Sequence, residues 1–226
     1  METYINNIED NGNHSFVSLA ENVIPEELST QWITYLRSID FYGGATSFGE
    51  IPRLQRFVCD KGEYFGKRAG WKDDGNPRWV ARSYDNTILS IQSYIQNYFD
   101  TNIARLRIPG VNPDAVFDSC LVNFYRCLKD SIKPHRDSEV VFGDNPPVII
   151  LSLGCTREII FERIIYNKVN PHSIKKDKLF QGGTIKISLP SGSILFMGGE
   201  MQKYYSHEIK KVFDGDASIG DMSYRY

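Results

Sequence analysis

Three residues in the second half of the chain have the types and spacing of a metal site. His135 and Asp137 are one residue apart, so on a β-strand their side chains point to the same face. His207, in an aromatic context after a predicted strand, is the natural third ligand. Two histidines and one carboxylate leave adjacent coordination positions open, the arrangement of non-haem Fe(II) oxygenases. A lone His-x-Asp pair also fits ordinary surface residues, and the downstream histidine is what favours a metal.

The strand predicted over 120–125 carries two further polar groups. Alternation along this strand places Leu121, Asn123 and Tyr125 on one face. The amide and the phenol are able to hydrogen-bond a carboxylate cosubstrate beside the metal. The alternative is an edge strand with one solvated polar face.

The sequence predicts two helices followed by a set of β-strands, and these strands must position the candidate ligands. An early proline, acidic residues in the first turn and apolar residues at helical spacing predict a helix over 25–39. Apolar steps of three and four predict a second helix over 86–99. Short β-rich runs bounded by Gly, Pro, Asn and Asp then predict strands over 120–125, 147–153, 158–161, 184–189 and 193–197. The pattern indicates a sandwich or barrel, with 166–183 as an exposed excursion between two strands.

The composition is that of an ordinary globular protein. The chain has 226 residues, 41% hydrophobic and 24% charged, with a formal net charge of −2. This balance excludes collagen, coiled coils and a polycation that coats nucleic acid by bulk charge. We expect an intracellular protein of the cytoplasm or nucleus, because the sequence has no secretory signal and no apolar run long enough for a bilayer. The four cysteines are widely spaced, match no zinc pattern and are expected to be reduced thiols.

Residues 51–82 differ from this average by their charge. They contain eight Lys or Arg residues and four acidic residues, a local net charge of +4, with aromatic residues interleaved. Basic groups contact phosphates and aromatic rings stack on bases, so the segment fits a nucleic-acid surface. The alternative is a solvated loop with its own small aromatic cluster.

Several motifs together resemble a known family. They are Asn123-Phe124-Tyr125, His135-Arg136-Asp137-Ser138-Glu139, Gly198-Gly199-Glu200, His207 and Arg225-Tyr226. In type and order they resemble the AlkB-type Fe(II)/2-oxoglutarate dioxygenases, and most closely the nucleic-acid demethylases among them. Pro52-Arg53-Leu54-Gln55 resembles part of the lid that recognises the base in the DNA-acting members.

This resemblance implies an α+β, mostly β fold: a double-stranded β-helix (jelly-roll) core with N-terminal helices and a base-recognition lid. It implies one domain over 1–226, in which 1–115 hold the helices and the lid and 116–226 hold the catalytic core. The implied Fe(II) ligands are His135, Asp137 and His207. The implied 2-oxoglutarate contacts are Asn123, Tyr125 and Arg225. The implied base contacts are Arg53, Gln55 and Glu139.

The implied activity is oxidative demethylation of bases such as 1-methyladenine or 3-methylcytosine in DNA or RNA. It uses Fe(II), 2-oxoglutarate and O2, and it releases formaldehyde, succinate and CO2. We expect a monomer whose partner is nucleic acid. We do not expect it to bind a membrane. After Arg225 the sequence lacks the rest of the family's terminal arginine motif. We therefore expect weakened cosubstrate binding or a shortened chain. The alternatives are a hydroxylase of a protein or small molecule, and a non-catalytic nucleic-acid-binding homologue.

Overall fold

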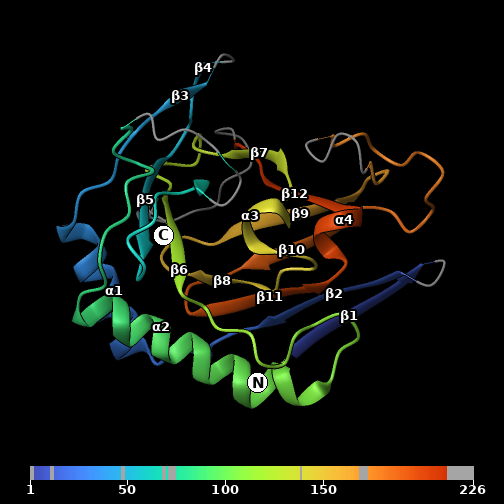
Figure 1. The fold of residues 1–226 in the computed structure, drawn as a ribbon, viewed down its shortest axis with the longest axis horizontal. Helices are drawn as coiled ribbons and strands as arrows, with labels where there is room; N and C mark the ends of the chain where they lie inside the picture. The colour runs from blue at the N-terminus through green and yellow to red at the C-terminus, as the bar shows by residue number, and fades with distance from the viewer. Residues whose placement is uncertain are drawn as a thin grey trace.

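Two four-stranded antiparallel sheets form the body of the protein (Figure 1). The computed structural model describes residues 3–10, 13–46, 49–67, 70, 75–137, 139–167 and 173–212. The first sheet has the order β1 (Thr3–Asp10), β2 (Asn13–Ala20), β11 (Ser193–Gly199) and β8 (Val148–Ser152). The second has the order β10 (Ile185–Leu189), β9 (Arg157–Arg163), β12 (Tyr205–Ile209) and β7 (Ile132–His135). The mostly β class predicted from the sequence is confirmed.

Strand β11 lies at the centre of the hydrophobic core and is buried on both faces. Its alternate residues Leu195 and Met197 join a cluster that includes Phe161 and Ile187 of the second sheet. This arrangement explains why the strand reads as a continuous apolar run rather than as an alternation. Strand β10, by contrast, alternates exposed residues with more buried ones.

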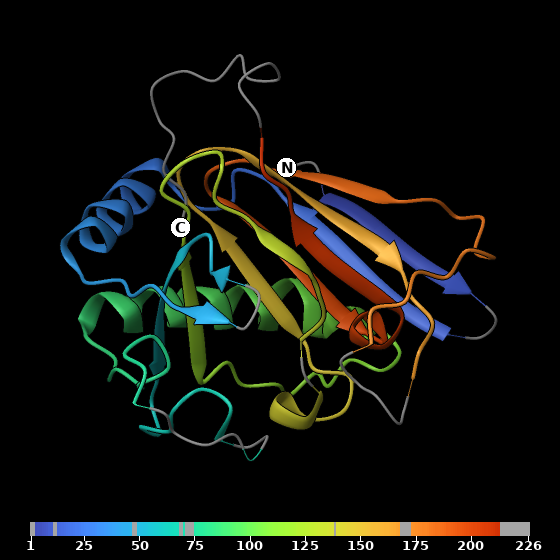
Figure 2. The same ribbon diagram turned by 90° about the horizontal axis from the view of Figure 1, so that it is seen from above.

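The two expected helices pack on the outer face of the first sheet. They are α1 (Glu26–Ser38) and α2 (Asn86–Tyr98), and each ends within one residue of its prediction. Ile194 of β11 joins Trp32 and Ile95 in a second core cluster, so the face of β11 that points away from the second sheet is covered by helices. Both helices lie below the strands in Figure 1, and the green helix α2 passes behind the strands in Figure 2. Within the described residues, no helix is long and apolar enough to cross a membrane.

The remaining described elements are short. They are β3 (Ala45–Thr46), β4 (Gly49–Glu50), the π-helix Phe99–Ile103, the 3-10 helix Ala104–Leu106, α3 (Glu139–Phe142) and α4 (Met201–Tyr204). A separate two-stranded sheet pairs β5 (Leu54–Cys59) with β6 (Ser119–Phe124). All four cysteines are free thiols, as expected.

Several strands were not predicted from the sequence, among them two at the N-terminus and the one that carries a metal ligand. Strands β1 and β2 form an N-terminal hairpin, and β2 pairs with β11 from Ala20 to Ser15, so the N-terminal part of the chain contributes to the first sheet. Strand β12, which carries His207, was not predicted either. For β2 and β12, periodicity alone is insufficient because each pairs with strands that are distant in sequence.

Candidate metal centre

The three predicted metal ligands come together in the structure. His135 ends β7 and His207 lies on β12, where the two residues pair directly across the strands. Their ring centroids are 4.2 Å apart, and Asp137 Oδ2 lies 3.7 Å from His207 Nε2. One ligand atom from each of the three residues lies within 4.8 Å of the others. Two imidazole nitrogens and one carboxylate oxygen are a donor set that fits Fe(II).

Both histidines are held in the neutral form that a metal requires. Burial lowers the pKa of His135 and holds the pKa of His207 well below its ordinary value. His135 Nδ1 lies 3.0 Å from the carbonyl oxygen of Lys133. A carbonyl only accepts hydrogen bonds, so Nδ1 carries the proton and Nε2 keeps its lone pair for the metal. Burial raises the pKa of Asp137, and the nearby His135 acts in the opposite direction.

The prediction that Asp137 shares a strand with His135 was wrong. Strand β7 ends at His135, so alternation does not set the direction of the Asp137 side chain. Instead, the Asp137 backbone N–H donates to Gln202 Oε1 at 2.8 Å. No motif or periodic pattern in the sequence marks Gln202. A single buried glutamine produces no periodic pattern in a sequence. The only sign that Gln202 lies near the metal ligands was its position five residues before His207.

Residues expected to contact different ligands meet at Asn123. Its Oδ1 accepts hydrogen bonds from Arg53 Nε at 2.8 Å and from Gln55 Nε2 at 2.9 Å. The register of β5 and β6 pairs Gln55 with Asn123, and Gln55 is only 1% exposed. With Oδ1 occupied by two donors and Nδ2 donating to the carbonyl oxygen of Leu121 at 3.5 Å, Asn123 has its second Nδ2 hydrogen left for a carboxylate. The base-recognition roles of Arg53 and Gln55 and the cosubstrate role of Asn123 stay predictions.

Two cationic side chains lie close to the buried Tyr125. The Arg157 guanidinium carbon is 5.6 Å from the Tyr125 ring centroid, and Arg157 Nη2 donates to the carbonyl oxygen of Asp130 at 3.0 Å. Burial lowers the pKa of Arg157 and of Arg53, and in each case the nearby Tyr125 acts in the opposite direction. The positive charge around the predicted cosubstrate residues favours a carboxylate ligand. Arg225, the predicted arginine contact, lies outside the described residues.

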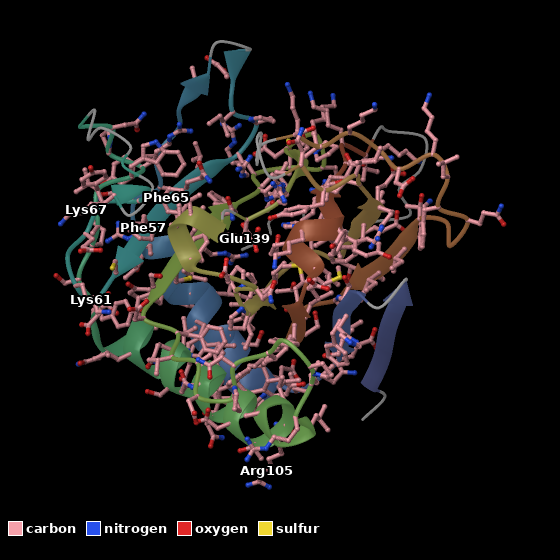
Figure 3. All side chains as sticks on the ribbon, turned by 45° about the vertical axis from the view of Figure 1, so that its right-hand side comes forward. Phe57, Lys61, Phe65, Lys67, Arg105 and Glu139 are labelled. Carbon is pink, nitrogen blue, oxygen red and sulfur yellow. The ribbon has the colours of Figure 1, made fainter. Side chains whose placement is uncertain are left out.

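Glu139, the implied base contact, does not lie on the strand that carries His135. It begins the short helix α3, so its direction is set by a helical turn. Its Oε1 lies 3.7 Å from Lys203 Nζ and 3.5 Å from the backbone nitrogen of Asn145, which donates to it. Figure 3 places Glu139 near the centre of the molecule, between the β-strands and the aromatic side chains Phe57 and Phe65. Its role in base recognition stays a prediction.

Three aromatic residues of segment 51–82 form a cluster that reaches α3. Phe65 stacks on Trp79 with centroids 4.7 Å apart and meets the edge of Phe57 at 5.3 Å. Phe65 also lies 6.3 Å from Phe142 on α3. The cluster therefore packs against the helix that begins two residues after Asp137. Arg68, Trp71 and Lys72 lie outside the described residues.

Replacing Gln55 by leucine is expected to weaken 2-oxoglutarate binding about tenfold. The change removes one hydrogen bond that orients the Asn123 amide, a loss of about 1.4 kcal/mol. Isothermal titration of 2-oxoglutarate into the metal-loaded protein measures the effect. The matched control is Gln92→Leu, because Gln92 Nε2 donates to the carbonyl oxygen of Phe117, away from the metal ligands. Equal affinity in the two variants contradicts the role of Gln55.

Comparison with known proteins places this arrangement in context. A family model described as the 2OG-Fe(II) oxygenase superfamily matches residues 16–223. The alpha-ketoglutarate-dependent dioxygenase alkB homolog 3 of Mus musculus is 32% identical over 114 residues, which cover 50% of this chain and 38% of the mouse protein. The DNA oxidative demethylase ALKBH2 of Arabidopsis thaliana is 25% identical over 123 residues, which cover 51% of this chain and 39% of the plant protein. The matches span less than half the length of either relative.

The fold also resembles a solved structure. "The structure of OsALKBH1" aligns with a TM-score of 0.58 and 18% identity, covering 92% of this chain and 95% of that chain. At this identity the likeness concerns the fold alone. Together with the two antiparallel sheets, it fits the predicted jelly-roll core.

Proposed function

The chain belongs to the 2OG-Fe(II) oxygenase superfamily, with relatives of the AlkB type, and on that premise we propose that it removes N-methyl groups from nucleic-acid bases. One observation carries the proposal: His135, Asp137 and His207 offer three ligand atoms within 4.8 Å of one another.

The protein's contribution to this chemistry is binding and orientation. When bound, Fe(II) and 2-oxoglutarate supply the O2-dependent hydroxylation of the methyl group, which then leaves as formaldehyde. His135 and His207 provide neutral nitrogens, and the Lys133 carbonyl fixes the tautomer of His135. Asn123 and Tyr125 hold the 2-oxoglutarate carboxylate, with Arg225 as a further proposed partner. The burial of His207 and Tyr125 keeps bulk water away from the reacting groups.

A nucleic-acid substrate is supported by the segment that borders the site. The aromatic cluster of Phe57, Phe65 and Trp79 packs against α3, and Lys61 and Lys67 lie on the same side of the molecule (Figure 3). Aromatic faces stack on bases, and lysines neutralise phosphates. The name of the Arabidopsis relative states that it is a DNA demethylase. A methylated base that has lost its pairing is the easiest one to turn out of the stack toward the metal. Arg53, Gln55 and Glu139 are its proposed contacts.

The test is mass spectrometry of oligonucleotides that carry 1-methyladenine or 3-methylcytosine. The protein is incubated with Fe(II), ascorbate and 2-oxoglutarate, and DNA and RNA versions are compared. We expect loss of the methyl group, with one formaldehyde and one succinate formed for each repaired base. A parallel incubation uses peptides and free amino acids in place of the oligonucleotide.

The two arms separate the proposed function from its alternatives. Succinate release that depends on a peptide or amino acid, with oligonucleotides unchanged, identifies a hydroxylase of another substrate class. Oligonucleotide binding without formaldehyde release identifies a non-catalytic homologue. Either result overturns the demethylase proposal.

A further inference from the structure

The short helix α4 connects the strand at the centre of the core to the strand that carries His207. It follows β11 and is followed directly by β12. Its second residue, Gln202, is 2% exposed, although glutamine is normally a surface residue. A buried amide of this kind requires hydrogen-bond partners, and its partners indicate what it does.

Both strong contacts of Gln202 go to the loop that carries a metal ligand. Its side-chain Oε1 accepts the backbone N–H of Asp137 at 2.8 Å, and its backbone oxygen accepts Arg136 Nη1 at 3.1 Å. Its Nε2 lies 3.8 Å from the sulfur of Met197, a weak acceptor. One residue of α4 therefore holds two consecutive residues of the ligand loop.

Asp137 needs this support because it lies beyond the end of β7. The pairing of β7 with β12 reaches His135, and Asp137 follows without a partner in that ladder. Rotation of the peptide at Asp137 would turn its carboxylate away from His207, which is 3.7 Å away. The hydrogen bond to Gln202 opposes this rotation. Gln202 lies five positions before His207, so the same segment of chain carries one ligand and holds another.

We propose that Gln202 is a positioning residue for Asp137 and thereby sets the affinity of the site for a divalent metal. This inference rests on one part of the proposed function, which is that the three ligands bind a metal. Partners of this kind, which act on the ligands rather than on the ion, typically change metal affinity by about 10- to 100-fold. Because Gln202 does not touch the ion, its effect passes through Asp137.

The experiment titrates Co(II), an optically visible probe, into the metal-free protein and its variants. Gln202→Met removes the acceptor and keeps the length of the side chain. We expect its Kd for Co(II) to rise about 10- to 100-fold and the visible absorption bands of the bound ion to shift. Gln202→Glu keeps an acceptor oxygen in either protonation state, and we expect its Kd to stay within about threefold of the wild type.

A matched control separates this role from a general loss of packing. Gln96 Oε1 likewise accepts a backbone N–H, that of Phe117, at 3.0 Å, away from the metal ligands. Gln96→Met should therefore lose a comparable amount of stability while its Co(II) affinity and spectrum remain those of the wild type. Thermal unfolding of each metal-free variant provides the comparison.

The outcomes distinguish the inference from the proposed function. If the wild type itself binds no Co(II), the proposed function fails. If the wild type binds Co(II) and Gln202→Met binds it as tightly as Gln96→Met, the positioning role is wrong. If Gln202→Met does not fold, Gln202→Asn decides the question, because its shorter side chain withdraws the oxygen from the Asp137 N–H but stays polar. A rise of about tenfold or more in its Kd for Co(II) supports the role, and wild-type affinity overturns it.

Discussion

Replacement of His207 by alanine is expected to abolish both metal binding and turnover. His207 is buried and supplies one of the three ligand atoms that converge at the site. Without it, His135 and Asp137 remain as two adjacent ligands on one side of the ion. We expect metal affinity to fall at least about a thousandfold, or about 4 kcal/mol. Co(II) titration and succinate release from a methylated oligonucleotide measure the two losses.

The control is another histidine of the same protein. His14 lies on β2 and is not a member of the ligand group. His14→Ala should retain the metal affinity of the wild type. If His207→Ala still binds Co(II) and releases formaldehyde at the wild-type rate, the assignment of the metal centre is wrong.

The second large effect is expected from Phe161, which joins the core to the metal site. Phe161 is 0% exposed, pairs with His207 across β9 and β12, and has its ring centroid 6.0 Å from that of His207. Phe161→Ala leaves a cavity between the two sheets and should lower the free energy of unfolding by about 3–5 kcal/mol. Urea unfolding of the metal-free protein measures the change, which approaches the whole stability of many domains.

Two comparisons test the reason for this loss. Phe161→Leu retains most of the volume and is expected to cost less than the alanine variant. Leu179, which is 91% exposed, gives the surface control, and Leu179→Ala should change stability by no more than about 0.5 kcal/mol. If Phe161→Ala and Leu179→Ala lower the free energy of unfolding by similar amounts, Phe161 is not the core residue described above.

Local patterns in the sequence determined a large part of the fold and the central residues of the site. The helices α1 and α2 were predicted within one residue at each end because apolar spacing and end signals act within a few turns. The apolar run of β11 was predicted as a strand for a similar local reason. The chemistry of imidazole and carboxylate, with the order of the three residues, was sufficient to predict the metal ligands that the structure brings together.

The tertiary structure alone decided how those residues are held. The sequence predicted Asp137 on a strand, whereas the strand ends at His135 and a buried amide from α4 orients the ligand. It assigned Gln55 and Asn123 to different ligands, whereas the pairing of β5 with β6 joins their side chains. These contacts link segments about 65 residues apart or more. Which distant segments pair, and in which register, depends on the burial gained by the whole fold rather than on local propensity.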